Sequence, residues 1–130
     1  RDEVVFCPTI SAPEEGAHAF VRSDNAKQVF DVRLNGVNAI CTRHNSGGTM
    51  VALSVGLKIK RSLAEGAAND VVAVPMMSAI VDANQTVMST DEFGYLVGFD
   101  KGSDSKFPVA EVEQLVPAGA RLVISLRPAY

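Results

Sequence analysis

Two histidines, one of them close to a serine, are the first side chains of this sequence that could take part in catalysis. His44 stands two residues before Ser46 at the start of a glycine-rich turn, and His18 lies between two alanines. A histidine that activates a serine needs both side chains within hydrogen-bond reach and an acid that orients the imidazole. Neighbours on a turn rarely adopt that geometry. We therefore expect both histidines to be exposed surface residues.

Two pairs of acidic residues have types suited to acid–base chemistry, namely Asp91 with Glu92 and Glu111 with Glu113. A retaining glycosidase holds its two carboxyl groups about 5 Å apart. Glu111 and Glu113 share one face of a predicted strand, but this spacing is equally typical of the solvated face of an edge strand, where like charges oppose aggregation. The pattern favours this second interpretation. We therefore assign no catalytic residue and do not expect an enzyme.

The two cysteines, Cys7 and Cys41, fall on two different predicted strands. An even pair placed in this way favours a disulfide, and a disulfide indicates a compartment outside the reducing cytosol. Loop-closure arithmetic gives such a bond roughly 3 to 4 kcal/mol of stabilisation. The alternative is a pair of buried free thiols in a cytosolic protein.

Metal and cofactor sites are not expected. Two cysteines and two scattered histidines lack the spacing of a zinc site. The segment Asp100–Asp104 is similar to an oxygen-rich calcium loop, but it lacks the third ligand and the bidentate glutamate of that loop.

The composition bounds the remaining possibilities. The chain has 130 residues, 47% of them hydrophobic, and a net charge of −3, which fits one globular domain spanning 1–130. The sequence shows no basic stripe, so we expect no nucleic-acid partner. The longest apolar run, Val71–Met77, is far shorter than the roughly 20 residues of a membrane span. The sequence opens with Arg1-Asp2-Glu3 and shows no signal peptide, so we expect any export segment to have been removed or left out.

Most of the chain has the alternation of β-strands. Val51–Ile59 places its large apolar side chains on one face. Gln28–Leu34 alternates in the same way, and alternation resumes at Val37, which indicates a bulge at Asn35-Gly36. His44–Gly48 predicts a hairpin turn. Further strands are expected at Val4–Ile10, Ala17–Arg22, Asp70–Val81, Thr86–Phe99, Phe107–Leu115 and Arg121–Leu126.

Seven or eight short strands separated by turns, without helical periodicity, predict an all-β fold. The simplest architecture is an antiparallel β-sandwich of the immunoglobulin or fibronectin kind. The chain has no tryptophan, so the pairing of a tryptophan with a disulfide in the core of antibody domains is missing. A small closed barrel is the alternative.

The segment Asp70–Val81 is apolar on both faces, and Pro75 in its middle predicts an edge strand or a bulge. Only one face of a strand in a two-layer sandwich can point into the core, so a loop or a partner must cover the other. Methionine is favoured both in irregular cores and on adaptable binding surfaces. The residues proposed for partner contact, with core or loop cover as the alternative, are Val72, Val74, Met76 and Met77.

Several motifs together resemble a family of small envelope lipoproteins from alphaproteobacteria, and the likeness covers most of the chain in order. The motifs are Cys7-Pro8, Cys41 after the strand with Phe30-Asp31-Val32, the polar hairpin His44–Gly48, the strand Val51–Ile59, the turn after Ala79-Ile80-Val81-Asp82, and Leu115-Val116-Pro117-Ala118-Gly119 before the last strand. The Leu115-x-Pro117 corner is also similar to fibronectin-type modules.

The resemblance implies export across the inner membrane and a lipidated cysteine upstream of Arg1. Cys7 follows Val4-Val5-Phe6 and not the small residues of a lipidation site, so a disulfide with Cys41 suits it better. The family brings no catalytic residue to this chain.

The function expected from these observations is that of a non-catalytic accessory subunit in the periplasm or at the outer membrane. It would act by protein–protein contact in a bacterial envelope complex. The second hypothesis is a module that binds glycan or peptidoglycan, although eight aromatic residues without a tryptophan count against it. The third is a hydrolase that uses His44 or the paired carboxylates.

Overall fold

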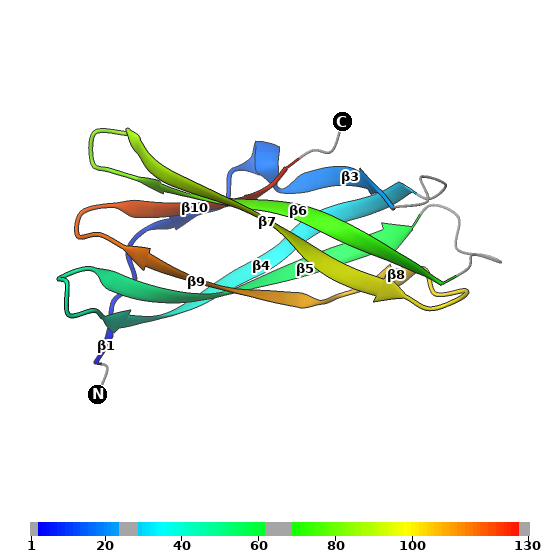
Figure 1. Cartoon of the computed structure of the whole chain (residues 1–130), viewed down its shortest axis with the longest axis horizontal. Helices are drawn as coiled ribbons and strands as arrows, with labels where there is room; N and C mark the ends of the chain where they lie inside the picture. Colours follow the sequence, from blue (N-terminus) through cyan, green and yellow to red (C-terminus); the bar gives the residue numbers. More distant parts are fainter. Residues whose placement is uncertain (1–2, 24–28, 62–68, 128–130) are drawn as a thin grey trace.

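The computed structural model describes residues 3–23, 29–61 and 69–127, and in these residues the chain forms two stacked β-sheets (Figure 1). Of the ten strands in this part of the chain, seven have five or more residues and three have two. The one helical element is the short 3₁₀ turn η1, Glu14–Gly16. The predicted all-β sandwich is therefore confirmed.

Sheet 1 is built around two long antiparallel strands, β4 (Val29–Arg43) and β5 (Thr49–Arg61), joined by the turn at His44–Gly48. The outer edge of β4 carries β3 at one end and β1 at the other, and the far edge of β5 carries β8 and β9. The bounds of these four strands are Val4–Val5 for β1, His18–Arg22 for β3, Ser105–Lys106 for β8 and Val109–Val116 for β9.

Sheet 2 has the order β2-β10-β6-β7. The short strand β2 pairs in parallel with β10, and the other pairs are antiparallel. The bounds are Ile10–Ser11 for β2, Asp70–Val81 for β6, Val87–Phe99 for β7 and Arg121–Leu126 for β10. With the seven longer strands lettered A to G in chain order, the sheets are ABCF and GDE, whereas immunoglobulin domains have ABED and CFG. The architecture is thus shared, and the connectivity is this chain's own.

The core lies between the two sheets and follows from the alternation seen in the sequence. The inward apolar side chains of β5, from Val51 to Ile59, are 0–1% exposed, as their period of two predicts. Phe30 of sheet 1 and Phe99 of sheet 2 meet with ring centroids 5.0 Å apart and an interplanar angle of 55°. This tilted aromatic pair joins the two layers directly.

The bulge predicted at Asn35-Gly36 is confirmed. The register between β4 and β5 shifts between Leu34 and Val37, and Gly36 has a φ of 95°, a conformation that glycine adopts without strain. The bulge divides the outer face of sheet 1 into one part near β1 and another near β3.

Pro75 stands where one edge of β6 loses its partner strand. β6 lies between β7 and β10, but β10 pairs only with Met76–Val81, and β6 has no bulge at the proline. The last β10–β6 pair joins Leu126 and Met76, and the carbonyl of Pro75 then accepts the Arg127 N–H at 2.8 Å. Proline has no backbone N–H to donate. It is tolerated here because β10 ends beside it, so no further carbonyl of β10 needs a donor from β6.

The N-terminal segment differs from the prediction of one strand over Val4–Ile10. It forms two short strands, because β1 pairs with β4 of sheet 1 and β2 pairs with β10 of sheet 2. Cys7 and Pro8 lie in the crossing between them. In the part of the chain that the structure describes, no helix has the length and hydrophobicity of a membrane-spanning segment.

Candidate functional site

The predicted disulfide is present. The sulfur atoms of Cys7 and Cys41 lie 2.06 Å apart, and their Cα atoms 5.3 Å apart. Cys41 is 1% exposed on the core side of β4, beside the pairing of β1 with β4. The bond therefore fastens the N-terminal crossing to sheet 1. Because disulfides persist in oxidising environments, it indicates a compartment other than the reducing cytosol.

The four residues proposed for partner contact lie on both faces of β6. Val72, Val74 and Met76 are 0% exposed and point into the core, so they cannot touch a partner while the domain is folded. This corrects the assignment of faces, because the sequence leaves open which of two apolar faces is turned inward. Met77 lies half-buried on the outer face.

The outer face of β6 and β7 is apolar and open. Val71 and Ala73 of β6 are exposed, and Leu96 of β7, which is opposite Ala73, is 70% exposed. The positions opposite Val71 and Pro75 are Gly98 and Gly94, so no side chain of β7 projects over the sheet there. We call Val71, Ala73, Met77, Gly94, Leu96 and Gly98 the β6–β7 apolar face.

This face has an ion pair at one end, and along one side it has the edge of β7 that does not pair with β6. Glu92 and Arg127 lie on opposite sides of β6, and their side chains meet at 2.9 Å. Among the described residues β7 pairs only with β6, so the other edge of its 13 residues offers free backbone donors and acceptors. Figure 1 shows β7 as the outermost strand of its sheet.

Two contacts tie β7 to β9 of the other sheet. The hydroxyl of Tyr95 donates to the Val109 carbonyl at 3.2 Å, and the amide of Gln114 donates to Asp91 at 3.0 Å. Asp91 thus has a structural partner, as does Glu92, and these two carboxylates do not form an acid–base pair directed at a common point.

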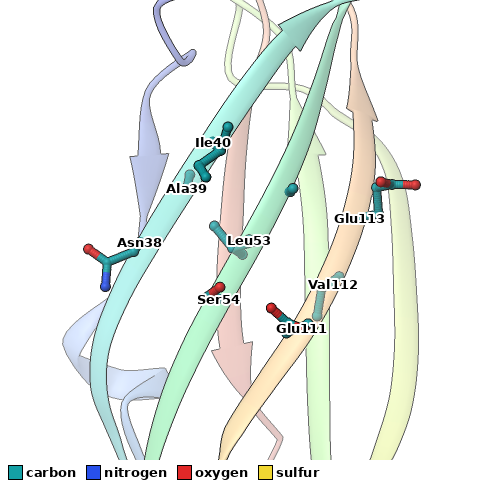
Figure 2. Close-up of a pocket in the computed structure, with 9 residues that line it drawn as sticks. Asn38, Ala39, Ile40, Leu53, Ser54, Glu111, Val112 and Glu113 are labelled. Carbon is teal, nitrogen blue, oxygen red and sulfur yellow. The ribbon is translucent and has the colours of Figure 1, made fainter. Parts of the chain in front are cut away.

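Glu111 and Glu113 share the outer face of β9, as their spacing predicts. They form one side of a shallow hollow of about 500 Å³ on sheet 1, with Asn38 and Ile40 of β4 on the other side (Figure 2). The short side chains of Ala52 and Ser54 form its floor. Both carboxylates are exposed, which is typical of a solvated sheet face.

His44 and Ser46 contact each other within the turn. The Nδ1 atom of His44 lies 2.8 Å from the Ser46 hydroxyl and also accepts the Ser46 backbone N–H at 3.2 Å. Both contacts are exposed and lie within one hairpin turn. The ring nitrogen that would have to take the serine proton already accepts a backbone N–H, so the contact supports the turn.

The segment similar to a calcium loop binds an arginine of its own chain. Arg61, which is 4% exposed, donates from Nε to the Ser103 carbonyl at 2.6 Å and from a terminal nitrogen to the Asp100 carbonyl at 2.5 Å. Its guanidinium also lies over the Phe99 ring, 5.2 Å from the centroid. Within the described ranges, no three His, Cys, Asp or Glu side chains are placed to hold a metal ion.

The outer face of sheet 1 near β3 carries a cluster that the sequence did not indicate. The strand register places side chains of three neighbouring strands in two rows. One row has His18, Arg33 and Lys58, and the other has Phe20, Asp31 and Lys60. We call these six residues the basic grid. A linear search for basic runs misses it because its members are far apart in the sequence.

Comparisons of the chain with protein-family models, with curated proteins and with solved structures find no match. The resemblance to envelope lipoproteins therefore rests on the sequence motifs alone.

Proposed function

We propose that this protein is a non-catalytic accessory subunit of a bacterial envelope complex, and that it acts by binding a protein partner along β7. The observation that carries this proposal is the coincidence of an unpaired strand edge with the β6–β7 apolar face. The edge offers backbone hydrogen bonds, and the face offers apolar surface beside them.

A polypeptide strand is the ligand that uses both features. An extended segment that adds to the edge of a sheet gains main-chain hydrogen bonds, and its alternate side chains pack against the neighbouring face. Natural proteins usually protect long edge strands with charges or cover. The half of β7 with Asp91 and Glu92 has such charges, whereas the half from Phe93 to Phe99 has none. We therefore place the partner strand along Phe93–Phe99.

The compartment belongs to the same proposal. The disulfide supports an oxidising environment, and the resemblance to envelope lipoproteins favours the periplasm, with a lipidated residue upstream of Arg1 as an anchor. Metabolic labelling of the full-length precursor with a fatty-acid analogue, followed by fractionation of the envelope, tests the anchor and the location together.

Site-specific photo-cross-linking tests the contact. A photoreactive residue in place of Leu96 should give one discrete adduct in the native envelope, and the same residue in place of Ile40 should not. Ile40 is a matched control because it is 66% exposed on the other sheet, against 70% for Leu96. Equal labelling at both positions, or none at Leu96, would contradict the proposal.

Hydrogen exchange tests the mode of binding. Once the adduct identifies the partner, its addition should slow exchange at alternate amides of Phe93–Phe99, because those amides gain acceptors. Unchanged exchange in β7 would mean that the partner does not bind by strand addition.

A further inference from the structure

We propose that the basic grid is a binding site for a phosphorylated sugar. The site lies on the sheet opposite the one proposed for protein contact, and it does not depend on that contact. The chemistry of the ligand follows from the arrangement of charge, the free side chains and one exposed aromatic ring.

The register brings basic side chains into direct opposition. Arg33 on β4 stands opposite Lys58 on β5, and His18 on β3 stands opposite Arg33. Lys60 follows Lys58 on the same face, roughly 7 Å along the strand. Like charges placed directly opposite on neighbouring strands are destabilising. A local arrangement that works against the fold is expected where it serves a function.

The one carboxylate of the grid, Asp31, stands opposite Lys60 in the register but forms its ion contacts with other side chains. Asp31 Oδ1 lies 2.7 Å from His18 Nε2 and 3.5 Å from Arg33 Nε. Within the part of the chain that the structure describes, Lys58 and Lys60 have no ion pair and are exposed. Their ammonium groups are therefore available to an anion.

The charge of the grid fits one phosphate monoester. Arg33, Lys58 and Lys60 carry three positive charges and Asp31 carries one negative charge, so the fixed charges sum to +2 (3 − 1). The whole chain has a net charge of −3, so the grid departs from its surroundings. A phosphate monoester carries about −1.5 to −2 charges at neutral pH and offers three acceptor oxygens. A nucleic acid would bring many phosphates, and the grid has charges for only one.

Hollows in this face give the ligand room beside the lysines. One, of about 200 Å³, is lined by Asp31, Arg33, Lys58 and Lys60. A second, of about 340 Å³, is lined by Phe20, Val29, Asp31, Lys60 and Arg61. Both hollows have Asp31 and Lys60 on their walls, so a group bound by the lysines has the second hollow next to it.

Phe20 supplies a surface for the ring of the sugar. It is 58% exposed, and its ring is held against the His18 ring with centroids 4.9 Å apart. Sugar-binding proteins commonly present an exposed aromatic side chain on which an apolar sugar face can lie. The carboxylate of Asp31, which stands between Phe20 and Lys60 in the grid, is placed to accept a hydrogen bond from a sugar hydroxyl.

Titration of the protein with four probes, followed by amide chemical shifts, tests the site. The probes are glucose 1-phosphate, inorganic phosphate, glucose, and vesicles of phosphatidylglycerol. We expect glucose 1-phosphate to shift the amides of β3, β4 and β5 around the grid, with an affinity about tenfold above that of inorganic phosphate or glucose. This gain requires both the anion and the ring.

Two variants test the contact of the lysines with the phosphate and the contact of Phe20 with the sugar ring separately. The double variant Lys58→Gln/Lys60→Gln should weaken both phosphate probes about tenfold or more. Phe20→Ser should weaken glucose 1-phosphate and leave inorganic phosphate unchanged. Lys101→Gln, in an exposed turn, is the matched control and should change neither affinity.

Three results would overturn the proposal. They are equal affinity for glucose 1-phosphate and inorganic phosphate, preferential binding to the lipid vesicles, and retention of binding by Lys58→Gln/Lys60→Gln. A thermal stability no lower than that of the wild type shows that a loss of binding in a variant is not a loss of fold. None of these results depends on the protein partner of β7.

Discussion

The carbonyl oxygen of Asn35 lies over Gly56, at the place where a side chain of β5 would otherwise stand on the outer face of sheet 1. The bulge in β4 brings this carbonyl inward over the neighbouring strand, so the bulge and the glycine require each other. A Cβ atom at position 56 would collide with the backbone of Asn35, which has no flexible end that could move aside.

Gly56→Ala is therefore expected to destabilise the fold by about 1–3 kcal/mol, the usual cost of overpacking. Gly98→Ala is the matched control, because a Cβ there meets nothing within 4 Å. That change should be neutral, or stabilising by up to about 1 kcal/mol through the unfolded state. Chemical denaturation of both variants measures the difference, and equal stabilities would show that the bulge can shift away from Gly56.

The pair Phe30–Phe99 should contribute more than the area that its two rings bury. Truncation of either ring to alanine is expected to cost about 3–5 kcal/mol. Truncation of both to leucine, analysed as a double-mutant cycle, should show a coupling of about 0.5–1.5 kcal/mol. Val32 and Val72, buried on different sheets, supply an aliphatic comparison when each is changed to alanine. Additive losses for the two phenylalanines would mean that the tilted contact adds nothing specific.

Arg61 should be essential for the loop that contains Asp100 and Ser103. Arg61→Gln removes the donors that satisfy both carbonyls and the cation over Phe99, and we expect a loss of about 2–4 kcal/mol. Arg61→Lys should rescue little, because an ammonium group cannot reproduce the fork of the guanidinium. Arg43→Gln, at an exposed arginine whose ion pair with Glu3 lies at the surface, is the control and should cost less than about 1 kcal/mol. Full rescue by lysine would indicate that charge alone holds the loop.

The sequence predicts well those features that depend on local pattern. The alternation in Val51–Ile59 gives the buried face of β5 without error, because a period of two has one apolar phase there. The turn at His44–Gly48 and the bulge at Gly36 follow from residues that accept a positive φ. The cysteine pair is found from its number and its placement on two strands.

Features that depend on which strands become neighbours are missed. The segment Asp70–Val81 is apolar in both phases, so the pattern cannot say which face is buried, and three of the partner-contact candidates, Val72, Val74 and Met76, prove to be core residues. Pro75 predicts an edge but does not predict that this edge begins part-way along β6, where β10 ends. The basic grid arises because the register places side chains from three separate segments side by side.

Loss of the disulfide should weaken the whole domain. The double variant Cys7→Ser/Cys41→Ala keeps the exposed position polar and the buried position apolar, and we expect it to lose roughly 3 to 4 kcal/mol. The wild-type protein in reducing buffer should lose a similar amount, and the variant should be insensitive to reductant. Equal unfolding midpoints for all samples would show that the N-terminal crossing is held without the bond.

The charge arrangement of the basic grid makes a prediction about stability as well as binding. Lys58→Glu replaces the like-charge opposition to Arg33 by an ion pair across β4 and β5, and cross-strand pairs of opposite charge stabilise by roughly 0.2–1 kcal/mol. We expect Lys58→Glu to unfold at a higher denaturant concentration than wild type in low salt. The gain should shrink in high salt, because an exposed pair is screened.

The same variant should lose its affinity for glucose 1-phosphate, since a carboxylate then faces the phosphate. Lys101→Glu, which makes the same change of charge away from Arg33, should change neither property. A lower stability of Lys58→Glu in low salt would mean that Arg33 and Lys58 do not repel each other in the folded protein. The opposition of these two charges would then not indicate a phosphate site.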